Sequence, residues 1–148
     1  MPSNDNQTVI RRLIGTWRLQ SFDIKTADGQ VTYPFGRDAV GYYIFAESGY
    51  VSVALMGAHR PKFAGGDVLA GSSEEKVAAA EGYISYSGQF EIRADKLIVH
   101  PEVSFFPNWI GVDQVRSFEL TDNTLTLSTP SMLLRGLQQT AHLVWERI

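Results

Sequence analysis

Short segments that alternate between apolar and polar residues, each followed by turn-forming residues, run along nearly the whole chain. Because successive side chains of a strand point to opposite faces, such segments are typical of half-buried strands in an antiparallel sheet. We expect strands at residues 17–25, 30–34, 41–46, 50–56, 83–92, 96–105, 114–120, 125–129 and 141–147. All except the brief second segment are principal strands, which gives eight.

Helix-forming sequence is confined to two places. Thr8 can cap a short helical turn that reaches Leu13 and stops at Gly15, and Ser73 can cap an alanine-rich helix over residues 74–81. A parallel α/β sheet would need a helix between most of its strands. The pattern therefore predicts an all-β fold: an eight-stranded antiparallel up-and-down barrel with a short N-terminal helical turn and one helical and loop insertion. A two-sheet sandwich is the alternative.

Length and charge narrow the class of protein further. A chain of 148 residues suits a single domain, residues 1–148. A net charge of -3 without any block of like charge argues against nucleic acid as a partner, and the absence of cysteine excludes disulfides and thiolate metal sites. Residues 1–7 are polar, and the longest apolar runs, such as 40–46, are too short to cross a bilayer. We expect a cytoplasmic protein without membrane insertion.

Six short motifs occur in a fixed order along the chain: LIGTWRL at 13–19, YPFG at 33–36, GY at 41–42, FFPNWIG at 105–111, LTLSTP at 125–130 and LVWER at 143–147. In this order and spacing they resemble the bacterial and fungal lipocalin-like domain family. The resemblance implies a calycin-type barrel. Members of that family resemble small-molecule binders, and some relatives shape intermediates in natural-product pathways, so the resemblance implies either binding or catalysis. It also implies that Trp17 packs under Arg147 or another basic side chain at the closed end of the barrel. From barrel geometry we expect Trp17, Trp145 and Arg147 to stabilise this base without touching ligand.

Strand periodicity assigns particular side chains to the barrel interior. In residues 83–92, Tyr86 shares one face with Phe90 and with Gly88, which either leaves space for a ligand or marks a β-bulge. The expected apolar lining consists of Tyr42, Ile44, Val51, Val53, Tyr86, Phe90, Phe118 and Leu143. A cavity with this lining would hold a small aromatic or fatty molecule, with the Tyr86 hydroxyl as a hydrogen-bond donor.

Arg116 shares the inward face of residues 114–120 with Phe118. A guanidinium in an apolar cavity needs an anionic partner, because an unpaired buried charge costs several kcal/mol. Arg116 therefore clamps an acidic group of the ligand, or pairs with Glu91 or Glu102, or lies across the outer surface. The sequence leaves these alternatives open.

The polar residues of 96–105 suggest a second kind of function. His100, Glu102 and Ser104 share one face, which simple alternation places in solvent. Facing inward, they would form an acid/base array, with Tyr86 as a further proton donor, for a cofactor-free cyclase, isomerase or dehydratase acting on a polyketide-like molecule. The three histidines of the chain are widely spaced and fit no metal-ligand pattern, so we expect no metal and no cofactor.

The loops at residues 56–69 and 106–109 are expected near the barrel ends, where they would control access to the cavity. Asn108 and Trp109 are candidate rim contacts for a ligand; alternatively, Asn108 fixes a turn and Trp109 covers the core. A barrel whose interior is packed solid with side chains would instead serve as an interaction domain. The oligomeric state stays open, a homodimer included.

Overall fold

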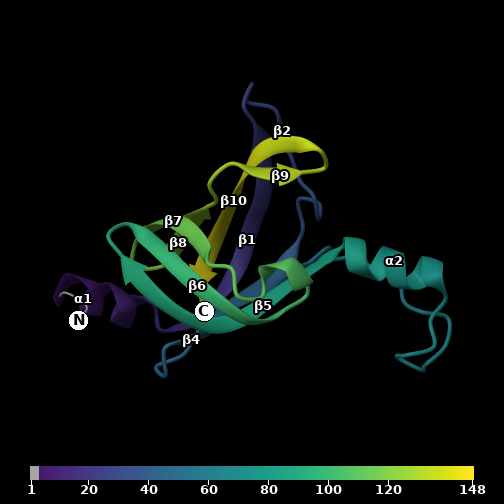
Figure 1. Ribbon diagram of the computed structural model, residues 1–148, viewed down its shortest axis with the longest axis horizontal. Helices are drawn as coiled ribbons and strands as arrows, with labels where there is room; N and C mark the ends of the chain where they lie inside the picture. Colours follow the sequence, from purple (N-terminus) through teal and green to yellow (C-terminus); the bar gives the residue numbers. More distant parts are fainter. Residues whose placement is uncertain (1–3) are drawn as a thin grey trace.

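The computed structural model describes residues 4–148, and its strands curl into one barrel (Figure 1). Eight antiparallel strands form the wall: β1 (Gly15–Thr26), β3 (Val40–Phe45), β4 (Tyr50–Met56), β5 (Tyr83–Arg93), β6 (Lys96–Ser104), β7 (Gln114–Leu120), β8 (Thr124–Ser128) and β10 (Leu137–Arg147). Each strand pairs with the next in this order, and β10 pairs with β1. This last pairing closes the sheet, so the predicted up-and-down barrel is confirmed and the sandwich is excluded.

Two short strands extend the wall at the seam between β1 and β10. β2 (Val31–Thr32) pairs with β1, as the sequence predicts, and β9 (Met132–Leu134) pairs with the beginning of β10. The β9–β10 hairpin was not expected. Its two turn residues, Arg135 and Gly136, have positive φ angles of 51° and 79°, as a type I′ turn requires. An arginine in the first turn position is not a recognisable signal for that turn.

The helices lie outside the wall, at opposite sides of the molecule (Figure 1). α1 (Asn4–Leu13) begins earlier than its predicted Thr8 cap and contributes the fully buried Leu13 to the core. α2 (Ser73–Glu81) is capped by Ser72, one residue before the expected cap, in a capping box with Glu75. A short 3-10 helix, η1 (Pro107–Trp109), follows β6. None of the helices among the described residues is long and apolar enough to span a bilayer.

The closed end of the barrel is built around Trp17, which has no exposed surface. Its indole nitrogen donates to the Leu13 carbonyl at 2.9 Å, which ties β1 to the end of α1. The Arg147 guanidinium lies 4.3 Å from the centroid of the Trp17 ring and donates to the Ile14 carbonyl at 3.1 Å. The expected packing of Trp17 under Arg147 is confirmed.

A β-bulge shapes the wall between β5 and β6. Ser87 pairs with Val103 but Gly88 pairs with Pro101, so Glu102 has no partner across the strands. A Cβ atom on Gly88 would lie 1.9 Å from the backbone oxygen of His100 on β6, which explains the glycine. The bulge reading of Gly88 is confirmed. Beyond the bulge the predicted apolar face of β6 turns outward, and Val103 is 68% exposed.

Candidate functional site

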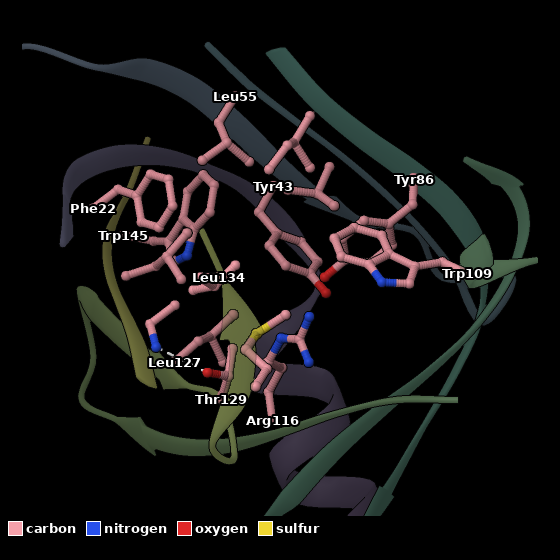
Figure 2. A pocket seen from close by; sticks show the side chains of 15 residues that line it. Phe22, Tyr43, Leu55, Tyr86, Trp109, Arg116, Leu127, Thr129, Leu134 and Trp145 are labelled. Atoms are coloured by element: carbon pink, nitrogen blue, oxygen red, sulfur yellow. Dashed lines mark hydrogen bonds between the residues drawn. The ribbon is translucent and has the colours of Figure 1, made fainter. Parts of the chain in front are cut away.

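The barrel interior above the packed closed end contains a cavity of about 110 Å³ (Figure 2). Fifteen side chains from the wall, from the segment after β8, from β9 and from η1 surround it: Phe22, Tyr43, Val53, Leu55, Ile84, Tyr86, Trp109, Arg116, Leu127, Thr129, Met132, Leu134, Ala141, Leu143 and Trp145. Most of these side chains are apolar. The barrel interior therefore contains an apolar cavity, and the alternative of a barrel filled completely with side chains does not hold.

Tyr43 is the side chain of β3 that lines the cavity, whereas the sequence analysis predicts this for its neighbours Tyr42 and Ile44. Tyr43 and Phe45 are 1% exposed, whereas Tyr42 and Ile44 are 48% and 44% exposed. The predicted inward orientation of Tyr42 and Ile44 is wrong by one residue of the alternation. Both faces of this strand carry an aromatic and a further apolar side chain, so the pattern alone could not choose between them. On the outside, the Tyr42 ring lies 5.9 Å from the Arg18 guanidinium.

The Arg116 guanidinium reaches the cavity from β7, and the residue is only 8% exposed. Its two terminal nitrogens donate to neutral acceptors, the Val115 carbonyl at 3.0 Å and the Gln114 side-chain oxygen at 3.2 Å. Among residues 4–148, no ion pair includes Arg116. A buried cation thus faces an apolar cavity with its charge uncompensated by a carboxylate.

The two internal partners that the sequence offered for Arg116 are occupied elsewhere or point away. Glu91 pairs with Arg93 and, at 3.4 Å, with the His100 imidazole. Glu102 is exposed at the bulge. Arg116 is also buried and does not lie across the outer surface, so neither the internal ion pairs nor the surface position expected as alternatives is found.

Tyr43 places a second polar group beside Arg116, and Figure 2 shows the Tyr43 hydroxyl and the guanidinium pointing toward each other. This hydroxyl is buried and makes no hydrogen bond of good geometry among the described residues, although the neighbouring Tyr86 side chain lies within hydrogen-bonding reach of it. Burial raises the pKa of Tyr43 well above its ordinary value; the nearby Tyr86 raises it further, and the Arg116 charge opposes the shift. Tyr43 therefore remains a neutral hydroxyl with its proton available for donation.

Residues 14–148 match the lipocalin-like domain. The chain belongs to the lipocalin-like domain family. It is also 30% identical over 107 residues to the 4'-hydroxy-3'-methoxypropiophenone carrier protein ppsC of Aspergillus oryzae, an alignment that covers 66% of this chain and 96% of that protein. The resemblance inferred from the six sequence motifs is confirmed.

Solved structures with a similar shape include a lipocalin-like protein from Bacteroides uniformis, with a TM-score of 0.49 and 14% identity over 93% of this chain and 99% of that one. A protein from Bacteroides eggerthii has a TM-score of 0.45 and 16% identity over 92% of this chain and 99% of that one.

The other predicted contacts of this lipocalin-like barrel divide between the cavity and its surroundings. Tyr86, Val53 and Leu143 line the cavity as expected, and so does Trp109, whose ring packs edge-on against Tyr86 with centroids 5.5 Å apart. Four predicted residues lie elsewhere: Val51 and Phe90 in the packed core, Phe118 against that core and Asn108 in solvent.

Trp145, which barrel geometry assigned to the base, also borders the cavity. The lipocalin-like barrel buries it completely, but its ring lines the cavity and packs edge-on against Tyr43 at 5.4 Å. Its indole nitrogen has no hydrogen-bond partner among the described residues. Trp145 therefore belongs to the cavity lining as well as to the barrel core. The alternation of β10 could have indicated that Trp145 lines the cavity, because it shares one face of the strand with Leu143, which was expected to face inward.

The acid/base array of the sequence analysis does not form in the lipocalin-like barrel. His100 lies on the outside of the wall, where its imidazole contacts Asp113 at 2.7 Å. Glu102 is exposed, and the Ser104 hydroxyl donates to the Phe106 carbonyl at 2.8 Å. The inward interpretation is wrong for His100, because alternation along β6 up to the bulge keeps Leu97 and Val99 inside and His100 outside. Ser104 pairs with Tyr86 beyond the bulge, but it is not among the side chains that line the cavity. Within the described chain, no three His, Asp or Glu side chains gather as a metal site.

Proposed function

We propose that this lipocalin-like barrel binds a small aromatic molecule that carries an acidic group, with the acidic group at Arg116 and the ring in the apolar part of the cavity. The observation that carries the proposal is the buried guanidinium without a carboxylate partner. Burying a cation in this way costs free energy that a bound carboxylate, phenolate or enolate recovers through a charge-assisted hydrogen bond. The Tyr43 hydroxyl is placed to donate to the same anion.

The dimensions of the cavity support a ligand with a single ring. An apolar protein cavity of about 150 Å³ accepts benzene. The cavity of about 110 Å³ is of the same order. Side chains such as Phe22, Leu127 and Trp145 supply the apolar and aromatic surface against which a ring would pack.

The comparison with the Aspergillus relative supports the same class of ligand. The name of that protein describes a carrier of 4'-hydroxy-3'-methoxypropiophenone, an aryl ketone with a phenolic hydroxyl. Such a molecule combines one aromatic ring with an ionisable oxygen. We propose that the present chain binds cargo of comparable chemistry.

The enzyme alternative receives no support from the cavity. Its proposed acid/base residues His100 and Glu102 are outside the wall, and the fifteen lining side chains include no carboxylate and no imidazole. Tyr86, Tyr43 and Thr129 do bring hydroxyls to the cavity, but hydroxyls without a neighbouring acid or base serve a binding site equally well. We therefore propose binding as the function.

Benzoate and benzamide provide the test, because they have nearly the same shape and differ in charge. Binding is followed by quenching of tryptophan fluorescence, since two tryptophans, Trp109 and Trp145, line the cavity. We expect benzoate to bind at least about tenfold more tightly than benzamide near pH 7, where benzoate is ionised. The variant Arg116→Gln is expected to abolish this preference.

The matched control is Arg18→Gln, which removes a positive charge from the outer surface, beside Tyr42, and not from the cavity. This variant should keep the preference for benzoate. Equal affinities of the unmodified protein for the two compounds, or an undiminished preference in Arg116→Gln, would contradict the proposal.

A further inference from the structure

A second hollow, of about 480 Å³, adjoins the cavity where β9 and η1 meet the wall. We call it the vestibule. Four side chains line both hollows: Ile84, Trp109, Met132 and Leu134. Because the same side chains form the boundary of both, the vestibule directly adjoins the inner cavity.

The vestibule has an apolar surface that the fold itself leaves uncovered. Phe105, Phe106 and Leu133 line it and are 42%, 45% and 66% exposed. Clustered apolar side chains of this kind on a surface mark a place where another molecule binds. The charged side chains of its lining are one acid and one base, Glu81 and Arg135, so the vestibule carries no net charge toward an occupant.

The size of the inner cavity determines what reaches the vestibule. At about 110 Å³ it has room for one aromatic ring and little more. The four side chains that line both hollows, Trp109 and Leu134 among them, make the vestibule the adjoining space for any further part of a ligand held at Arg116. An uncharged, apolar substituent matches the surface that it meets there.

We propose that the vestibule is a second binding subsite, which takes the apolar tail of a ligand whose acidic aromatic head lies at Arg116. The ligand class is thus a one-ring aromatic acid or acidic phenol that carries an alkyl or acyl chain. This inference rests on the proposed function of the inner cavity. It adds a chain to the ligand and assigns a role to Leu133 and Phe106, which do not touch the inner cavity.

The test compares benzoate with benzoates that carry a butyl or an octyl chain on the ring and keep the free carboxylate, by isothermal titration calorimetry. The chain is attached at ring position 3 in one series and at position 4 in the other, so that two directions of exit are sampled. In at least one series we expect affinity to rise about tenfold or more from butyl to octyl. A fully buried methylene contributes about fourfold, and the vestibule is open on one side.

Leu133→Asn tests the vestibule itself. It should weaken the octyl compound about fivefold and leave benzoate unchanged, and Leu133→Ala, which keeps β9 apolar, should weaken the octyl compound about threefold. The matched control is Leu137→Asn, since Leu137 is 59% exposed, lies opposite Leu134 in the same hairpin and lines neither hollow. It should alter neither affinity. Thermal unfolding of each variant shows that the fold is intact.

Failure of this inference differs from failure of the proposed function. If benzoate binds through Arg116 but chain length adds no affinity in either series, the vestibule subsite is refuted and the inner cavity keeps its role. If no benzoate of either series binds, both proposals are refuted.

A second copy of the chain is the competing occupant of the vestibule. Sedimentation velocity measured with the unmodified protein and with Leu133→Asn distinguishes it. We expect the same sedimentation coefficient for both proteins. A dimer that Leu133→Asn dissociates would assign the vestibule to self-association and overturn the inference.

Discussion

Replacing Tyr43 by phenylalanine removes one buried hydroxyl and leaves the ring, which stacks on Phe45 at 4.5 Å, in place. The hydroxyl makes no hydrogen bond of good geometry within the described chain, where Tyr86 is its polar neighbour. A buried polar group without a partner costs about 1–3 kcal/mol. The ligand-free Tyr43→Phe protein should therefore be more stable than the unmodified one by about 1 kcal/mol, the lower end of that range.

The gain in stability should be accompanied by a loss of affinity. For a chain of this size, about 1 kcal/mol raises the midpoint of thermal unfolding by about 2–4 °C, which circular dichroism resolves. The same variant should bind benzoate about fivefold more weakly, because one donor to the carboxylate is lost. Opposite changes in stability and affinity are what we expect of a polar group that is retained for its ligand.

Tyr50→Phe is the matched control, since Tyr50 is 40% exposed and its hydroxyl accepts a hydrogen bond from Gln89 at 3.0 Å on the outer surface. Its stability should change by less than about 0.5 kcal/mol, with no change in benzoate binding. The reasoning is refuted if Tyr43→Phe lowers stability by about 1 kcal/mol or more and binds benzoate as before, because the hydroxyl would then serve the fold.

Three further predictions concern stability, each measured by urea unfolding. An unfolded tyrosine ionises near pH 10 while buried Tyr43 keeps its proton, so the free energy of unfolding should fall as pH rises above 10. Tyr43→Phe should reduce the slope of this fall by up to about 1.4 kcal/mol per pH unit, and an unchanged slope would contradict the raised pKa of Tyr43. Gly88→Ala places a Cβ 1.9 Å from a backbone oxygen and should lower the free energy of unfolding by about 2 kcal/mol or more. Gly65→Ala, whose Cβ would have nothing within 4 Å, should leave it almost unchanged, and equal effects of the two variants would contradict the bulge geometry. Arg147→Met should lower the free energy of unfolding by about 2–3 kcal/mol, because a cation–π contact with Trp17 and backbone hydrogen bonds are lost. The control Arg37→Met removes an exposed guanidinium 4.6 Å from the Tyr33 ring and should change it by less than about 0.5 kcal/mol.

The barrel is predictable from the sequence because its strands are joined mainly by short local turns. Gly29 and Gly49 both have φ near 88° and end such hairpin turns, and both stand in recognisable turn sequences. The β9–β10 hairpin lacks such a signal, since Arg135 occupies the turn position where asparagine or glycine is usual. Local chemistry therefore indicates the strands and their order, except where a turn uses an uncommon residue.

The site is only partly predictable, because it depends on which face of each strand turns inward. On β7 the polar neighbours Ser117 and Glu119 mark the outer face, and Arg116 is correctly placed inside. On β3 both faces are apolar, so Tyr43, the donor beside Arg116, is missed. Whether Arg116 meets Glu91 or Glu102 depends on the register of β5 and β6 across the bulge, which no local pattern specifies.

The central claim is that the buried Arg116 meets the acidic group of a ligand inside the barrel. A crystal structure with 4-bromobenzoate tests it most directly, because the anomalous signal of bromine locates the ring. We predict a carboxylate within hydrogen-bond distance of the Arg116 guanidinium and bromine inside the barrel wall. A bromobenzoate bound only on the outer surface, or in the cavity with its carboxylate turned away from Arg116, would contradict the claim.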